Sequence, residues 1–284
     1  MTFHARRIDG DALPWSLPGG KLAFRGPAVD PEGPFVAVLG ASEVAGRHVA
    51  EPFTHSLSHA LAMPVANLGV QNGGADVILR EREGILAMAA RAEVTVLQTL
   101  GLHNLTNRFY RVHPRRNDRF LRPSKLMRET FGRADFSDFV FTRHMTAALR
   151  GHGAFPYAQL VAELQAAWVA RMQEIVIRIP NRIVLLHIEG TRGAAQGDDP
   201  LRVTDAMIEA VMRGCDAEVR CDVREMYDDV HLEEMQFAPE ERESARHALP
   251  PVAHDLVAER LVRAVGPLLR GCPAPARSAR RHDA

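Results

Sequence analysis

Short apolar runs alternate with longer segments of helical periodicity along most of the chain. Five of the runs are rich in β-branched residues and bounded by glycine, proline or asparagine, which is typical of buried strands. They are FVAVLG (35–40), PVANLGV (64–70), VTVLQTLG (94–101), RIVLLHI (182–188) and AEVRCDV (217–223). Apolar residues recur at helical spacing in the segments 43–62, 75–92, 157–179, about 203–213 and 252–270.

This alternation predicts βαβ units, because parallel strands need a crossover connection and helices supply it. We therefore predict an α/β fold, a three-layer α/β/α sandwich around a flavodoxin-like five-stranded parallel sheet of order 2-1-3-4-5. A single domain over residues 35–270 accommodates all of these elements. Proline and glycine at the start predict an irregular arm at 1–34, and the basic end predicts a disordered tail at 271–284.

Composition and charge restrict the class of protein only in part. Hydrophobic residues make up 46% of the 284 residues, and Lys+Arg and Asp+Glu are equal at 35 each. A neutral chain is atypical of a general nucleic-acid coat, so any binding of anions is expected to be local. The sequence has neither a run of about 18 apolar residues nor the pattern of a signal peptide. We expect a cytoplasmic protein without a nucleic-acid or membrane partner.

Cofactor and metal motifs do not stand out. The three cysteines form no CxxC pair, and neither G-x-G-x-x-G nor G-x-x-x-x-G-K-[ST] occurs. His103, His113, His144 and Asp118 are the nearest approach to a metal-binding set, but they lack a tight spacing such as H-x-x-x-H. The sequence therefore predicts no cofactor and no metal.

Polar residues follow each of the first three predicted strands. Ser42 follows the first, Asn72 and Gly73 follow the second, and Asn104 of GLHN follows the third. In a doubly wound sheet these positions meet at the carboxyl edge, where ligands bind. The segment after the last strand supplies three histidines, at positions 231, 247 and 254.

This order of blocks resembles the SGNH (GDSL-type) hydrolases over roughly residues 35–270. The arginine-rich block NRFYRVHPRRNDRF (107–120) is similar to that of a bacterial branch of this superfamily whose function is unknown. The resemblance implies an SGNH-like fold with Ser42 as the nucleophile. It also implies an oxyanion hole formed by the Ser42 N–H, the Gly73 N–H and the Asn104 side chain, with a histidine as the base.

Three blocks depart from the family pattern, and the third carries an extra residue, GLHN rather than Gly-x-Asn. The Gly-Asp-Ser of the family is Gly40-Ala41-Ser42 here, so the usual aspartate is missing. Asn72 stands at the spacing of the second block, with Gly73 one place later. A serine at this position is also a preferred helix N-cap, which is the alternative interpretation of Ser42.

The base has three candidates. Asp228 and His231 match the Asp-x-x-His pattern but lie far from the last predicted helix. His247 fits by its distance to that helix, with Glu243 nearby, whereas His254 begins the helix itself. Spacing alone does not choose among the three histidines.

The stretch RFYRVHPRRNDRFLR (108–122) concentrates six arginines in a neutral chain. We interpret it as an anion clamp formed by Arg108, Arg115, Arg116 and Arg119, because arginine forks bind carboxylate, sulfate or phosphate bidentately. The alternative is a structural network with acidic residues downstream, at Glu129, Asp135 and Asp138. Interleaved aromatic residues favour that alternative.

Together these residues predict hydrolysis or transfer of an ester (O-acyl) group on an anionic or carbohydrate-like substrate, a small molecule or a glycan, through an acyl-enzyme on Ser42. An esterase and an acyltransferase would share these residues. The competing hypothesis is a catalytically inactive SGNH-like protein that binds an anionic ligand through the arginine-rich loop. An enzyme needs a histidine nitrogen within about 3 Å of the Ser42 hydroxyl, and a binding protein does not.

Overall fold

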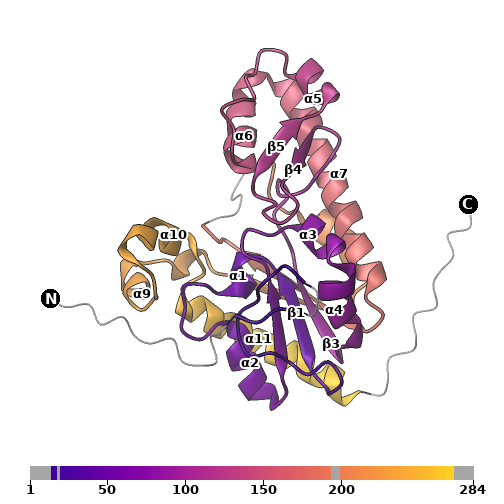
Figure 1. Ribbon diagram of the computed structural model, residues 1–284, viewed down its shortest axis with the longest axis vertical. Helices are drawn as coiled ribbons and strands as arrows, with labels where there is room; N and C mark the ends of the chain where they lie inside the picture. The colour runs from indigo at the N-terminus through magenta and orange to yellow at the C-terminus, as the bar shows by residue number, and fades with distance from the viewer. Residues whose placement is uncertain (1–13, 18–19, 193–198, 272–284) are drawn as a thin grey trace, which may run out of the picture.

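A central sheet of five parallel strands organises the protein, as seen in a computed structural model that describes residues 14–17, 20–192 and 199–271 (Figure 1). The strand order is β2-β1-β3-β6-β7. The strands are β1 (Val36–Gly40), β2 (Val65–Gly69), β3 (Val94–Gln98), β6 (Arg182–Glu189) and β7 (Ala217–Asp222). They correspond to the five predicted strands in the predicted spatial order, so the predicted doubly wound α/β sheet is confirmed.

Helices cover both faces of this sheet and complete three layers. Every residue of β1, β2 and β3 is buried, which explains why these strands read as continuous apolar runs. One hydrophobic core lies between the sheet and α2 and α11, and another lies on the opposite face. The helices are α2 (Phe53–Leu61) and α11 (Pro251–Arg270) on one face, and α3 (Ala75–Arg80), the π-helix η2 (Arg82–Leu86), α4 (Ala87–Arg91), α7 (Ala154–Arg178) and α8 (Asp205–Met212) on the other.

The predicted helix over 43–62 is interrupted. It consists of α1 (Ser42–Ala45), a loop, and α2. Gly46 ends α1 with a φ of 58°, a left-handed conformation that a side chain would strain, and Pro52 precedes the first residue of α2. The loop between them carries Arg47 and His48 toward the carboxyl edge of the sheet.

The N-terminal arm is described from residue 14, apart from 18–19, and it is largely irregular. Trp15 forms a β-bridge with Phe24, which is buried in the core. The Arg25 guanidinium donates hydrogen bonds to the carbonyl oxygens of Val49 and Ala50, at 2.6 and 2.7 Å, so the arm holds the loop after α1. The predicted tail, apart from its first residue, lies outside the described residues.

Residues 105–153 build a second lobe, called the upper lobe here, that the sequence did not predict. It begins with an antiparallel hairpin of β4 (Tyr110–Val112) and β5 (Phe120–Pro123). The hairpin is followed by α5 (Lys125–Thr130), α6 (Thr142–Leu149) and the 3₁₀ turn η3 (Arg150–His152). Its own apolar core packs against the first half of α7 (Figure 1). The long helix α7 therefore connects the upper lobe to the sheet domain, because its first half packs in the core of the lobe and its second half packs on the sheet.

Asn117 anchors the hairpin to the sheet domain. Its Oδ1 accepts hydrogen bonds from the N–H groups of Gly74 and Val77, at 2.9 and 3.1 Å, and its Nδ2 donates to the carbonyl oxygen of His113. The side chain is fully buried. These bonds satisfy N–H groups at the start of α3 that have no intrahelical partner, and they fix the hairpin above the carboxyl edge of the sheet.

The segment after β7 returns to the same edge. It forms the short elements η4 (Arg224–Met226), α9 (Asp229–Glu233), η5 (Pro239–Glu241) and α10 (Arg242–His247). A small apolar cluster of Val49, Leu232, Met235 and Ala245 packs this segment against the loop after α1. Within the described ranges, no helix is both long and apolar enough to cross a membrane.

Candidate active site

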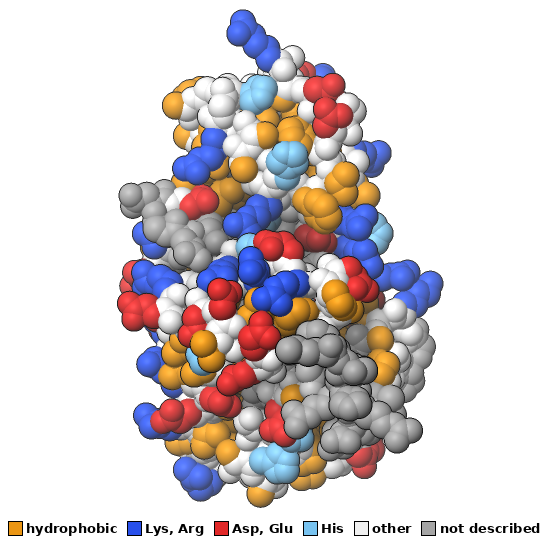
Figure 2. All heavy atoms as spheres, turned by 90° about the vertical axis from the view of Figure 1, so that its left-hand side faces the viewer, with side chains coloured by type: hydrophobic (Ala, Val, Ile, Leu, Met, Phe, Trp, Pro, Cys, Tyr) orange, Lys and Arg blue, Asp and Glu red, His pale blue; other side chains and the backbone are white. Residues whose placement is uncertain are grey.

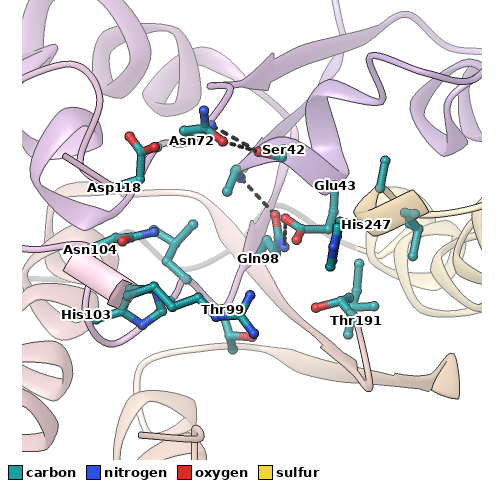
Figure 3. A pocket seen from close by; sticks show the side chains of 18 of the residues that line it. Ser42, Glu43, Asn72, Gln98, Thr99, His103, Asn104, Asp118, Thr191 and His247 are labelled. Carbon is teal, nitrogen blue, oxygen red and sulfur yellow. Dashed lines mark hydrogen bonds between the residues drawn. The ribbon is translucent and has the colours of Figure 1, made fainter. Parts of the chain in front are cut away.

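A cavity of about 820 Å³ lies at the carboxyl edge of the sheet, beneath the upper lobe (Figure 3). Loops that follow β1, β2, β3 and β6 line it, together with α6 and the end of α10. The predicted site residues that line it are Ser42, Gly73, Asn104, His247 and His254. Those that do not are Asp228, His231, Arg108, Arg115, Arg116 and Arg119.

Ser42 is the first residue of α1, directly after the end of β1. Its Oγ accepts a hydrogen bond from the Asn72 N–H at 3.0 Å and lies 3.4 Å from Asn72 Oδ1 (Figure 3). Because α1 begins at Ser42, the Ser42 N–H has no acceptor in a preceding helical turn. Ser42 lines the cavity, with its hydroxyl next to Asn72.

The turn after β2 brings the N–H of Asn72, rather than that of Gly73, next to the Ser42 hydroxyl. Asn72 has a φ of 56°, and asparagine is one of the few residues that adopts this left-handed conformation readily. The Gly73 N–H donates to the Val70 carbonyl oxygen at 2.9 Å, so it is already occupied. Gly73 lines the cavity as predicted, but the N–H next to the Ser42 hydroxyl is that of Asn72.

The Asn104 amide is oriented by the upper lobe. Thr142 Oγ1, at the start of α6, lies 2.9 Å from Asn104 Oδ1 and 3.0 Å from the Asp118 carbonyl oxygen, and its one proton is shared between these two acceptors. Thr142 is fully buried, and its backbone N–H also donates to the Asp118 carbonyl oxygen. With its oxygen occupied, Asn104 has its NH₂ group available to the cavity (Figure 3).

Gln98 and Glu43 form hydrogen bonds around Ser42, and neither residue was predicted from the sequence. Gln98 Oε1 accepts the Ala41 N–H at 2.9 Å, and its Nε2 donates to Glu43 Oε2 at 2.9 Å (Figure 3). The first bond fixes the backbone before Ser42, and the second holds the side chain of the residue after it. The signal that could have indicated this role is a buried glutamine at the end of the apolar strand VTVLQ.

The Asp-x-x-His motif serves a different purpose from the predicted one. Asp228 is the N-cap of α9, and its Oδ1 accepts the His231 N–H at 2.7 Å. The His231 ring lies between two carboxylates, 3.7 Å from Asp228 and 3.6 Å from Glu234. Since neither residue of the motif lines the cavity, His231 is not positioned to act on Ser42.

His254 lines the cavity but has the wrong tautomer for a base. Its Nδ1 accepts the Phe53 N–H at 3.1 Å, so in the neutral ring the proton is on Nε2. The side chain is 1% exposed, and burial, with a smaller contribution from Arg25, lowers its pKa to about 3. Lacking a vacant lone pair, His254 serves to hold the start of α2 instead.

His247 is the remaining predicted histidine. It ends α10 and lines the cavity (Figure 3). Its ring is half exposed, and its Nε2 lies 3.3 Å from Glu243 Oε1. A carboxylate beside an imidazole is the usual way to orient a base and to stabilise its protonated form. In the described part of the chain, the hydrogen bonds of Ser42 Oγ go to Asn72 and none goes to a histidine.

The arginine block lies outside the cavity. Tyr110 and Val112 of β4 point into the core of the upper lobe, so the alternating residue Arg111 points to solvent. Arg108 pairs with Glu163 at 2.6 Å, and Arg119 lies over the Phe141 ring. The predicted clamp at the cavity mouth is therefore not formed by Arg108, Arg115, Arg116 and Arg119.

The predicted alternative, a network with the acidic residues downstream, does not form either. Glu129 pairs with Lys125 at 3.6 Å, and Asp135 accepts hydrogen bonds from Ser137. Positive charge reaches the cavity through four other arginines, Arg47, Arg143, Arg202 and Arg224. Two of these already contact carboxylates, Arg47 at Glu241 and Arg224 at Asp222.

Buried neutral histidines surround the cavity. Burial is the first cause that lowers the pKa of His103, to about 4, and the neighbouring Arg143 adds to the effect. Burial also lowers the pKa of His187, whose Nδ1 lies 2.8 Å from Thr99 Oγ1 on the cavity floor. Among the described residues, no group of three histidine, cysteine or acidic side chains is arranged to hold a metal ion.

Because burial lowers the pKa of these histidines, we expect the free energy of unfolding to decrease in acid. His254 is neutral when folded but binds a proton below about pH 6.5 when unfolded. The contribution of His254 to the free energy of unfolding is therefore complete above pH 6.5. As the pH drops toward 3, this contribution decreases by up to about 1.4 kcal/mol per pH unit. Urea unfolding at pH 7 and pH 5 should show a smaller loss in His254→Gln, whose amide oxygen still accepts the Phe53 N–H. Exposed His247→Gln is the control, and equal losses in wild type and His254→Gln would refute this explanation.

Residues 1–269 match the model of a protein family described as Domain of unknown function (DUF6473), and the chain belongs to this family. A search of curated proteins finds no match. A similar solved structure is that of a family two carbohydrate esterase from Clostridium thermocellum in complex with cellohexaose. The two chains are 11% identical with a TM-score of 0.43, over 87% of this chain and 67% of the other. The family description does not specify an SGNH hydrolase, so that resemblance remains a prediction from the residues.

Proposed function

We propose that the protein is a serine-dependent esterase or acyltransferase of SGNH type, with the cavity at the carboxyl edge of the sheet as its active site. The observation that carries the proposal is the surroundings of the Ser42 hydroxyl. The Asn72 N–H bonds to it, and the Ser42 N–H, the Asn104 amide and His247 lie on the same cavity. Acyl transfer needs a hydroxyl nucleophile, amide donors and an imidazole in one place.

In the proposed reaction the Ser42 oxygen attacks the carbonyl carbon of an ester, and His247 takes the hydroxyl proton. The N–H groups of Ser42 and Asn72 and the Asn104 NH₂ donate to the oxyanion that forms. When the bond to the alcohol breaks, His247 returns the proton to the leaving oxygen. Water, or an acceptor alcohol in a transferase, then attacks the acyl-serine by the same steps in reverse.

His247 must turn toward Ser42 for this reaction. The ring is half exposed and contacts the exposed carboxylate of Glu243 on the same helix, so rotation breaks no buried packing. Catalytic hydrogen bonds are often longer without substrate and tighten in the Michaelis complex. Glu243 would then hold the second ring nitrogen and stabilise the imidazolium.

Cavity arginines support an anionic or carbohydrate-like substrate. Arg143 and Arg202 line the same cavity as His103 and Asn104. Arginine forks bind carboxylate, sulfate or phosphate groups, whereas Thr99 and Glu43 offer hydrogen bonds suited to hydroxyl groups. An acylated sugar acid fits both kinds of contact.

A binding protein is the second candidate function. It is favoured by the resting contacts of Ser42, whose hydroxyl is bonded to Asn72 rather than to a histidine in the described residues. Such a protein would use the same cavity and its arginines to hold an anionic ligand without turnover.

Covalent labelling with a fluorophosphonate separates the two functions. Intact mass should show one adduct on the wild-type protein and none on Ser42→Ala, because the reagent reacts with serines that an adjacent base activates. Ser244→Ala, an exposed serine on the same cavity, is the matched control and should be labelled like wild type. Labelling of neither wild type nor variant would favour the binding protein.

A further inference from the structure

The upper lobe carries a strong positive charge in a chain that is neutral as a whole. Residues 105–153 contain eleven Lys and Arg residues against four Asp and Glu residues, a net charge of +7. Figure 2 shows Lys and Arg side chains distributed over the upper part of the molecule, between patches of exposed hydrophobic side chains. The remainder of the chain has a compensating negative charge, so the lobe is the electrostatically distinct part.

Two arginines of the hairpin lie directly opposite each other. Arg111 of β4 pairs in register with Arg122 of β5, and both side chains are exposed. Like charges at directly opposite positions of an antiparallel pair destabilise it, so such a pair calls for a compensating anion. No acidic side chain pairs with either arginine in the described ranges. The next two arginines, Arg115 and Arg116, are exposed at the hairpin turn.

These arginines form one surface that leads to the cavity. We call it the hairpin face, and it consists of Arg111, Arg115, Arg116, Arg119 and Arg122. Arg119 forms a β-bridge with Phe141, and its guanidinium lies 5.5 Å from the centre of the Phe141 ring. Phe141 is 45% exposed and also lines the cavity, so the face continues into the cavity mouth.

We propose that the hairpin face is a docking surface for an anionic polysaccharide, whose acyl groups it brings to the cavity that holds Ser42. The role of the polysaccharide as substrate rests on the proposed function, whereas the docking does not. Arginine forks fit the carboxylate and sulfate groups that such polymers carry at regular intervals. A polymer can lie along the face while one ester-bearing residue enters the cavity.

Two other anionic partners are alternatives for this face. Single-stranded nucleic acid binds through bases stacked on aromatic rings, and Arg119 already covers Phe141, the exposed aromatic ring at this face. An anionic bilayer would contact the lobe through exposed apolar side chains such as Leu121, Val140 and Phe141 as well as through the arginines, so vesicles are included in the test below.

Binding to defined polymers tests the proposal. Polygalacturonate and heparin, which carry carboxylate and sulfate groups, should bind the full-length protein at low salt, and neutral dextran should not. The double variant Arg111→Gln/Arg122→Gln should weaken binding by about tenfold or more, which corresponds to about 1.4 kcal/mol. The matched control, Arg80→Gln/Arg82→Gln, removes two exposed arginines outside the upper lobe and should bind within about twofold of wild type.

Three outcomes would overturn the proposal. These are equal affinity of the two double variants, binding of dextran, and tighter binding of a single-stranded oligonucleotide or of phosphatidylglycerol vesicles than of either polysaccharide. Fluorophosphonate labelling of the wild type, measured beside polysaccharide binding, separates this proposal from the function. Polysaccharide binding without labelling of the wild type would retain the docking surface and reject the esterase.

Discussion

Replacing Ser42 with alanine should reduce the turnover of an activated ester, such as p-nitrophenyl acetate, by about 10³-fold or more. The variant loses the oxygen that forms the acyl-enzyme, while the amide donors of Asn72 and Asn104 remain. In serine hydrolases the loss of the nucleophile costs about as much as the loss of the whole catalytic set, and the oxyanion donors supply the residual rate. Steady-state hydrolysis, with stability checked by urea unfolding, measures the effect.

Ser244 provides the matched control for this substitution. Its hydroxyl lies on the same cavity, 3.4 Å from Nε2 of the buried His48. The proposed mechanism gives Ser244 no step, so Ser244→Ala should retain turnover within about twofold. Loss of turnover in Ser244→Ala together with full activity in Ser42→Ala would transfer the nucleophile to the other serine.

Asn104→Ala should lower kcat by about 10²- to 10³-fold and leave KM nearly unchanged. The Asn104 NH₂ is assigned to the oxyanion, which exists only in the tetrahedral intermediate and the transition states around it. Removal of one such donor costs about 2.7–4 kcal/mol of transition-state stabilisation. An increase in KM at constant kcat would instead assign Asn104 to substrate binding.

Thr142→Val extends this prediction to the residue that orients the amide. The valine retains the shape of the side chain but removes the hydroxyl that bonds to Asn104 Oδ1 at 2.9 Å. The amide can then turn its oxygen toward the cavity, so kcat should fall by a smaller factor, about tenfold. A loss in Thr142→Val as large as that in Asn104→Ala would show that Thr142 acts in another way.

The sheet and the positions of its loops were predictable because they depend on local pattern. The five strands are buried on both faces, so each reads as a continuous apolar run bounded by turn residues. Once the strand order follows from the doubly wound fold, the positions after β1, β2 and β3 must share one edge. This argument predicted that Ser42 and Asn104 lie at the same edge, where both line the cavity.

The remaining features depend on contacts between distant parts of the chain. The bond of Gly73 to Val70 and the left-handed turn at Asn72 decide which N–H faces Ser42. His254 is excluded by one backbone N–H 201 positions away, at Phe53. The alternation of Tyr110, Arg111 and Val112 did contain the hairpin pattern, but the density of charge favoured a loop.

The most direct test of the central claim is acid quench of the protein within milliseconds of mixing with an activated ester, followed by peptide mass spectrometry. The proposed mechanism predicts an acyl group on the peptide that contains Ser42, which appears before the first turnover ends and is absent in Ser42→Ala. An acyl group on the Ser244 peptide, or turnover without any acyl-serine, would contradict the assignment of Ser42 as the nucleophile.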